Sequence, residues 1–249
     1  MKNMETYSKC IVAFLDILGF KNMINTKAFE EIREIFSNVI PQSDFCLALG
    51  RAAYDEDIVL NQYNDVLSET KMHIMSDSII IAAPVGYPEA LAVVIDICDV
   101  IQEQLYDLEV PVFLRGAIAE GDFYLDEQLI FGKGLVDAYV AQENYAVYPR
   151  IIVSDAVVKG KTVSVDSEWK KLPRDKDGYF YINTLERYFQ CKTLDEFVTN
   201  GQVKKIRQCV DSRLQGYADS HLREKYIWIR QELERIKHNL AYDNNIVMV

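Results

Sequence analysis

The chain has 249 residues, of which 49% are hydrophobic and 26% are charged, a composition typical of a globular protein with a sizeable core. Its formal net charge of −11 argues against non-specific binding to nucleic acid or to a membrane surface, because both require a positive field. No apolar run approaches the roughly 20 residues of a membrane-spanning helix, and residues 1–7 lack the apolar segment of a signal peptide.

The five cysteines are scattered and include no CxxC pair, so neither a zinc site nor a disulfide framework is expected. We therefore expect a cytoplasmic protein that has neither nucleic acid nor a membrane as a partner.

The first half of the chain is predicted to contain strands that end near acidic residues. Residues 9–16 have the apolar pattern of a buried strand, and residues 21–40 have the spacing of an amphipathic helix that Pro41 ends. Residues 42–68 leave loop, helix and strand open. Residues 71–83 are predicted as a hairpin that turns at Ser76-Asp77-Ser78, and a helix follows from residue 86 to about 108.

The second half begins with strands and ends with helices. Strands are predicted at 110–124, 129–131, 150–154 and 178–183, with a helix at 132–144. After about residue 185 the pattern is helical, with a capping box at Thr193–Glu196 and helical spacing over 222–240. Residues 246–249 are expected to form a tail or a late strand. The sequence predicts an α+β core over 1–185 and a helical extension over 186–249.

Two aspartates, Asp16 and Asp77, each lie where an apolar, β-rich segment ends. A buried carboxylate is unfavourable unless it is paired or bound to a cation, so two of them on two strands suggest a shared divalent metal site. Two ions about 3.5–4 Å apart can stabilise both the attacking and the leaving oxygen of a phosphoryl transfer. The simpler alternative is that Asp16 caps the following helix and Asp77 is a turn residue.

Arg115 lies within an apolar strand, where a guanidinium needs an anionic partner. A phosphate group and a structural ion pair with a carboxylate are the two alternatives. The backbone N–H groups after Asp16, where a helix begins, could also face phosphate oxygens.

Five segments in this order resemble class III nucleotide cyclases, the catalytic domains of adenylate and guanylate cyclases. Phe14–Phe20 is similar to the first metal motif, and Ile74–Asp77 is similar to the second, where glycine usually precedes the aspartate. Leu114–Gly121 resembles the strand whose arginine contacts the triphosphate, and Phe131–Ala138 and Pro149–Ser154 resemble the next two blocks.

This resemblance implies a ferredoxin-like core with a central, mostly antiparallel sheet and flanking helices. It also implies a homodimer with active sites at the subunit interface, and two divalent ions, Mn²⁺ or Mg²⁺, as cofactors. The substrate would be a nucleoside triphosphate. Asp16, Ile17 and Asp77 would hold the metals, and the implied phosphate contacts are Leu18, Gly19, Phe20, Arg115 and Lys176.

Besides the residue before Asp77, the chain departs from the cyclase pattern at four positions. His73 and Leu129 stand where a lysine and an aspartate usually recognise a purine, so they are candidates for a different base pocket. Val136 and Val140 replace an asparagine and an arginine that serve the ribose and the transition state. The cations that could substitute for this arginine are Lys133, Arg150, Arg174 and Lys176.

One branch of this family, the pyrimidine cyclases of the bacterial Pycsar anti-phage system, is resembled most, although Gln142 stands where a glutamate is expected. The segments that carry this resemblance are the exact form of Phe14–Phe20, the Ser76-Asp77-Ser78 turn, Ala138-Tyr139 followed by Tyr148–Ile151, and the helical tail with Lys225–Trp228. The resemblance implies that UTP or CTP is converted to cyclic UMP or cyclic CMP, which activates a separate effector protein during phage infection. Two alternatives stay open: a divergent adenylate or guanylate cyclase, and a catalytically inactive cyclase-like sensor or interaction domain.

Overall fold

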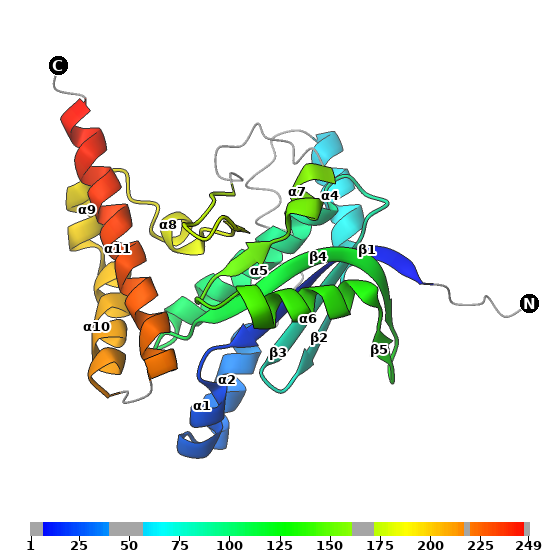
Figure 1. Cartoon of the computed structure of the whole chain (residues 1–249), viewed down its shortest axis with the longest axis horizontal. Helices are drawn as coiled ribbons and strands as arrows, with labels where there is room; N and C mark the ends of the chain where they lie inside the picture. Colours follow the sequence, from blue (N-terminus) through cyan, green and yellow to red (C-terminus); the bar gives the residue numbers. More distant parts are fainter. Residues whose placement is uncertain (1–6, 40–56, 161–171, 217–219, 247–249) are drawn as a thin grey trace, which may run out of the picture. The chain divides into compact units, whose positions relative to one another are not determined.

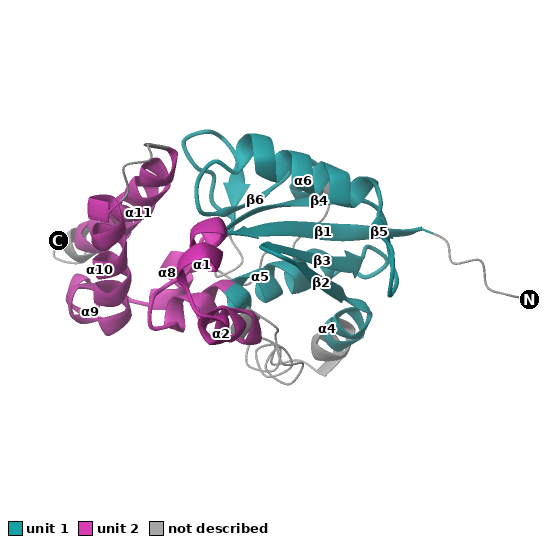
Figure 2. Ribbon diagram, turned by 90° about the horizontal axis from the view of Figure 1, so that it is seen from below, with its two compact units in different colours: residues 1–17, 40–101, 114–182 teal, residues 18–39, 102–113, 183–249 magenta. Residues whose placement is uncertain are grey.

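The computed structural model of the chain describes residues 7–39, 57–160, 172–216 and 220–246 (Figure 1). The chain divides into two compact units (Figure 2). The first comprises residues 1–17, 40–101 and 114–182, and the second comprises 18–39, 102–113 and 183–249. A catalytic domain that ends near residue 185 stays a prediction, since the second unit also takes two segments from within the range 1–185.

The first unit contains the sheet, which is mostly antiparallel as predicted. Its seven strands lie in the order β2-β3-β1-β4-β6-β7, and β5 pairs with the end of β4. The strands are β1 (Ser8–Ile17), β2 (Lys71–Met75), β3 (Ser78–Pro84), β4 (Leu114–Leu125), β5 (Ile130–Phe131), β6 (Ile151–Val153) and β7 (Phe180–Tyr181).

The four strands at one side of this sheet have a ferredoxin-like arrangement. Strand β1 pairs antiparallel with both β3 and β4, and β3 pairs antiparallel with β2. The connection from β1 to β2 therefore passes over β3, and the connection from β3 to β4 passes over β1. Two parallel strands with an antiparallel strand between them are the split βαβ pattern. Strand β6 then adds parallel to β4, and β7 pairs antiparallel with β6. The predicted α+β fold class is confirmed.

Helices cover both faces of the sheet (Figure 2). Helix α6 (Lys133–Tyr145) lies on one face, and α4 (Asp57–Glu69) and α5 (Ala90–Asp107) lie on the other. Short side chains let α6 lie close to β4: a Cβ atom added to Gly121 would stand only 2.6 Å from the backbone nitrogen of Gly134. The core beneath α6 consists of Cys10, Val12, Ile80, Ala82, Ala119, Phe123 and Ala138.

The second unit is helical in its described part. It contains α1 (Phe20–Thr26), α2 (Phe29–Val39), α8 (Thr184–Phe189), α9 (Leu194–Thr199), α10 (Gly201–Gly216) and α11 (Ser220–Ile246), whereas α7 (Asp155–Gly160) belongs to the first unit. Both hydrogen bonds of the predicted capping box at Thr193 and Glu196 are present. Within the described ranges, no helix is long and apolar enough to cross a bilayer.

Three predicted boundaries were wrong. The expected helix at 21–40 is two helices, because the Glu31 carboxylate accepts the Ala28 N–H (3.0 Å) and starts a new helix there. Strand β4 begins at Leu114, because the N–H of Val112 donates to the Leu105 carbonyl instead of a neighbouring strand. Helix α11 extends to residue 246, beyond the helical spacing predicted over 222–240. Pro41, the predicted end of the first helix, and the predicted tail at 247–249 lie outside the described ranges.

Candidate active site

Asp16 and Asp77 lie together at one edge of the sheet, as the sequence predicted for a shared site. Asp16 is the penultimate residue of β1, and the Ile17 N–H donates to the backbone carbonyl of Asp77 (3.0 Å). The strand register places Asp16 opposite Ser78 on β3 and opposite Arg115 on β4. The end of β1, the β2–β3 turn and the beginning of β4 therefore meet at this edge.

The simpler alternative holds for one aspartate and fails for the other. Asp77 does lie in the tight β2–β3 turn, where Ser76 has a φ of 58°. Asp16, however, does not cap the following helix: the N-cap of α1 is Gly19, and no side chain caps it. Asp16 is instead a strand residue, and its partner is a cation.

That partner is Arg115. Its Nε donates to Oδ2 of Asp16 at 2.7 Å, and its Nη2 donates to Oε1 of Glu143 at 3.2 Å. The side chains of Arg115 and Asp16 are only 18% and 20% exposed, so water screens this pair only partly. The structure thus gives Arg115 the carboxylate partners of the ion-pair alternative. The sequence missed Glu143, since an arginine in an apolar strand signals the need for an anion without indicating which one.

The charges at this edge favour a divalent cation. Three carboxylates and one guanidinium, those of Asp16, Asp77, Glu143 and Arg115, sum to a net charge of −2. In the described part of the chain the Asp77 carboxylate has no hydrogen-bond or ion-pair partner. Carboxylate and carbonyl oxygens are the ligands that Mg²⁺ and Mn²⁺ prefer, so Asp16, Asp77 and the carbonyl of Ile17 fit such ions. No cluster of three or more His, Cys, Asp or Glu residues with metal-binding geometry occurs among the described residues.

The residues after Asp16 offer fewer N–H groups than the sequence suggested. The Leu18 N–H donates to the Phe113 carbonyl at 2.8 Å, so the expectation that it is free for a phosphate oxygen was wrong. The N–H groups of Gly19 and Phe20 have no acceptor within the described ranges. They precede the first complete turn of α1, whose early N–H groups lack partners within the helix.

The two base-pocket candidates lie at different places on the sheet. His73 is half-buried on β2, and its register through β3 places it on the same face as Asp16 and Arg115. Leu129, 55% exposed, precedes β5 at the opposite end of β4 from Arg115. Leu125 lies ten residue steps along β4 from Arg115, which is about 33 Å at the usual rise of a strand. One protomer therefore does not bring Leu129 to the aspartates.

The four candidate cations differ in how their side chains are engaged. Lys133 forms an ion pair with Asp137, one turn along α6. The Arg150 side chain is 1% exposed and pairs with two aspartates. Arg174 pairs with Asp155 and lies 3.9 Å above the ring of Phe180. The remaining cation, Lys176, is exposed, and its ammonium has no partner in the described part of the chain.

No family model matches the sequence, and no curated protein matches it. Similar solved structures are nucleotide cyclase domains. The catalytic core of a rhodopsin-guanylyl cyclase with converted specificity, in complex with ATPalphaS, is 12% identical with a TM-score of 0.45, over 70% of this chain and 93% of that one. A bacterial light-regulated adenylyl cyclase is 13% identical with a TM-score of 0.43, over 82% of this chain and 100% of that one. An adenylate/guanylate cyclase/hydrolase from Silicibacter pomeroyi is 16% identical with a TM-score of 0.42, over 71% of this chain and 95% of that one.

Proposed function

We propose that the protein is a pyrimidine nucleotide cyclase that converts UTP or CTP to 3′,5′-cyclic UMP or cyclic CMP and pyrophosphate. The observation that carries this proposal is the meeting of Asp16, Asp77 and Arg115 at one edge of the sheet. These residues come from three separate strands or turns, and they combine oxygen donors for a cation with a donor for a phosphate.

In this proposal, Asp16, Asp77 and the carbonyl of Ile17 would hold two divalent ions, Mn²⁺ or Mg²⁺. Such ions, when bound, make the ribose 3′-oxygen a better nucleophile and neutralise the triphosphate. The 3′-hydroxyl gives up its proton to solvent and its oxygen forms a bond to the α-phosphorus, while the bond from that phosphorus to the pyrophosphate oxygen breaks and pyrophosphate leaves with the electron pair. Arg115 and Lys176 would orient the phosphate groups.

The proposal includes a homodimer with the active site at the subunit interface. Leu129 lies beyond the end of β4 that is opposite to Arg115, too far to line the same site in one protomer, so a base pocket with Leu129 needs a second copy. The outer face of α6 exposes Val136, Tyr139 and Val140, at 56%, 48% and 43%, which is suitable for subunit contact. Analytical ultracentrifugation would test this: a monomer at micromolar concentration contradicts it.

For the biological role, we propose that the product is a second messenger in anti-phage defence in the cytoplasm. The cyclic nucleotide would bind a separate effector protein, and the cyclase itself need not touch that effector. A cell-based assay tests this: expression of an active chain together with its effector should reduce phage replication, and inactivation of Asp16 should abolish the protection.

A second candidate is a catalytically inactive cyclase-like interaction domain. It is favoured by the engagement of Arg115 with Asp16 and Glu143, which leaves this guanidinium less available to a phosphate. Valine at positions 136 and 140 also supplies no charge for a transition state.

A product assay separates the two candidates. Purified protein is incubated with each of the four nucleoside triphosphates and Mn²⁺, and the products are identified by mass spectrometry. We expect a cyclic pyrimidine nucleotide from the wild type and none from Asp16→Asn. Cyclic AMP or cyclic GMP as the main product would indicate a divergent purine cyclase, and the absence of any cyclic product would favour the inactive domain.

A further inference from the structure

Lys176 lies at the tip of a tight turn that its own backbone stabilises. The Gly178 N–H donates to the Asp175 carbonyl (2.8 Å), and the Asp175 N–H donates to the Tyr179 carbonyl (3.0 Å). Gly178 has a φ of +88°, a conformation that a glycine adopts without a steric penalty. The Asp177 carboxylate accepts the Tyr179 N–H (3.2 Å), and the Asp175 carboxylate accepts the Lys176 N–H (2.6 Å).

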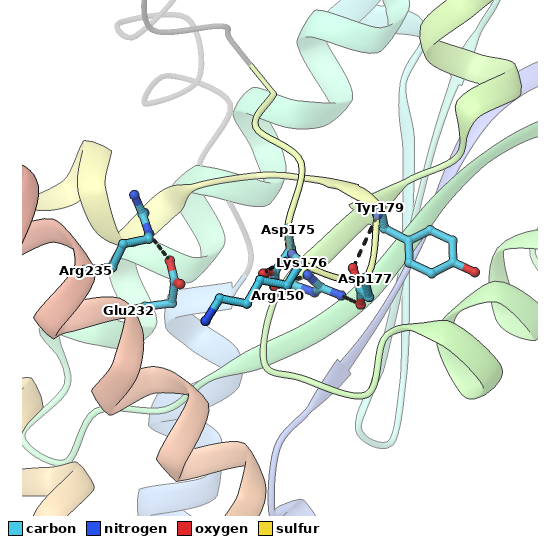
Figure 3. A network of polar contacts seen from close by, with 7 residues as sticks. All are labelled: Arg150, Asp175, Lys176, Asp177, Tyr179, Glu232 and Arg235. Atoms are coloured by element: carbon cyan, nitrogen blue, oxygen red, sulfur yellow. Dashed lines mark hydrogen bonds and ion pairs between the residues drawn. The ribbon is translucent and has the colours of Figure 1, made fainter.

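A buried arginine holds both aspartates of this turn. Arg150 donates from Nη1 to Asp175 and from Nη2 to Asp177, so one guanidinium bridges the residues on either side of Lys176 (Figure 3). Its side chain is 1% exposed, and the rings of Tyr148 and Tyr181 lie 5.5 and 5.6 Å from its Cζ. This burial excludes Arg150 itself from contact with a substrate. In Figure 3 the Lys176 side chain points away from the two carboxylates.

Two independent contacts place this turn at the same edge of the sheet as the aspartates. The Arg150 carbonyl accepts the N–H of Gly116, the residue after Arg115, at 3.1 Å. The ring of Tyr179 stacks on Tyr145 in the last turn of α6, with 5.3 Å between centroids and 26° between planes. Two residues earlier on the same helix, Glu143 pairs with Arg115.

We propose that Arg150 is a positioning residue, which fixes the 175–178 turn through Asp175 and Asp177 so that the Lys176 ammonium meets the triphosphate of the substrate. The inference rests on the proposed function, since it uses the same site and the same substrate. A lysine on a free loop must be ordered when it binds a ligand, whereas a turn held at both flanks is already in place. The bond between one guanidinium and two carboxylates is suited to this role because its fork geometry is rigid.

The test is a double-variant cycle in the full-length protein. Asp177→Asn removes one of the two carboxylates that Arg150 bridges. The Asp177 side chain is 34% exposed, so the variant should still fold. Lys176→Met removes the ammonium. Arg150→Lys keeps the positive charge at position 150 but loses the two guanidinium nitrogens that bridge Asp175 and Asp177. Lys9→Met is the control, because Lys9 is an exposed lysine that pairs with Glu120 on the β1–β4 ladder. The affinity for Mn²⁺ and 3′-deoxy-UTP, which cannot cyclise, is measured by calorimetry for every variant.

We expect Lys176→Met to weaken triphosphate binding about tenfold, since bonds to charged groups contribute about that factor. Asp177→Asn and Arg150→Lys should weaken it several-fold, with faster amide exchange over residues 174–181. The decisive outcome is the double variant Asp177→Asn/Lys176→Met, which should bind no more weakly than Lys176→Met alone. Binding of UMP, which lacks the distal phosphates, should stay unchanged in all variants.

Two results would overturn the positioning role. One is that Asp177→Asn weakens triphosphate binding by the same factor in the wild type and in Lys176→Met. The other is that triphosphate binding stays unchanged in a variant whose turn shows faster amide exchange. The proposed function fails separately, when the wild type binds the triphosphate but forms no cyclic product. In that case the binding cycle still decides the role of Arg150. A wild type that binds no triphosphate would overturn both.

Discussion

Replacement of Arg115 by methionine is expected to destabilise the protein through the carboxylate that it leaves behind. Exposed ion pairs contribute about 0–1 kcal/mol, whereas loss of one partner of a buried pair costs about 3–5 kcal/mol. Arg115 and Asp16 lie between these limits, because their side chains are 18% and 20% exposed and their atoms are 2.7 Å apart. We therefore expect a loss of about 2 kcal/mol, which lowers the melting temperature by about 4–8 °C in a chain of this size.

The same reasoning predicts a change of sign for Asp16→Asn. In the wild type this substitution removes a paired carboxylate and should destabilise the fold. In Arg115→Met it removes an uncompensated carboxylate and should raise the free energy of unfolding. Urea denaturation of the four variants measures both effects. Lys9→Met, which breaks an exposed pair with Glu120, serves as the control and should change stability by less than about 0.5 kcal/mol.

A divalent ion extends this prediction to the proposed metal site. Arg115 and a cation compete for Asp16, so Mn²⁺ should raise the melting temperature of Arg115→Met more than that of the wild type. The reasoning is refuted if Asp16→Asn destabilises both backgrounds equally. An Arg115→Met protein as stable as the wild type would refute it as well.

Two further substitutions test the packing of α6, and one titration tests the β4–β5 turn. Gln142 is 1% exposed, and among the described residues neither polar atom of its amide has a hydrogen-bond partner. Gln142→Met should therefore raise the free energy of unfolding by about 1–2 kcal/mol in urea titrations, and a loss would reveal a bound partner. Gly121→Ala should lower it by about 1–3 kcal/mol, because its Cβ would stand 2.6 Å from the Gly134 nitrogen; an unchanged midpoint would contradict this close contact. The N–H of Gln128 lowers the pKa of Asp126, so the stability that this hydrogen bond contributes is present above the unfolded pKa and is lost as pH falls through the folded pKa. NMR titration should find a midpoint below that of an aspartate in an unfolded peptide, and an unshifted midpoint would contradict this.

The sequence predicted most strands and their turns because those signals are local. The apolar run that ends at Asp16 and the turn at Asp77 lie within a few residues of the features that define them, and their meeting follows from two strands of one antiparallel sheet. The break near Ala28 was missed, since it depends on one side-chain bond from Glu31 rather than on apolar spacing.

The ionic partners within the site could not be predicted in the same way. Glu143 lies 28 residues from Arg115 along the chain, and Asp177 lies 27 residues from Arg150. An apolar strand with one arginine indicates that an anion is near, but many carboxylates in an acidic chain satisfy that condition. Only the packing of α6 and the 175–178 turn on the sheet selects among them.

Helix α6 also shows why the two valines that depart from the cyclase pattern leave the fold intact. Gly134, Ala138 and Gln142 are its buried residues, spaced four apart, whereas Val136 and Val140 are 56% and 43% exposed. Valine at these two positions therefore changes the surface and not the core. In the proposed homodimer, this exposed apolar area on α6 would favour association of the two copies. Under the proposed function, these two valines would supply contact area between the copies in place of the asparagine and arginine that the resemblance implies.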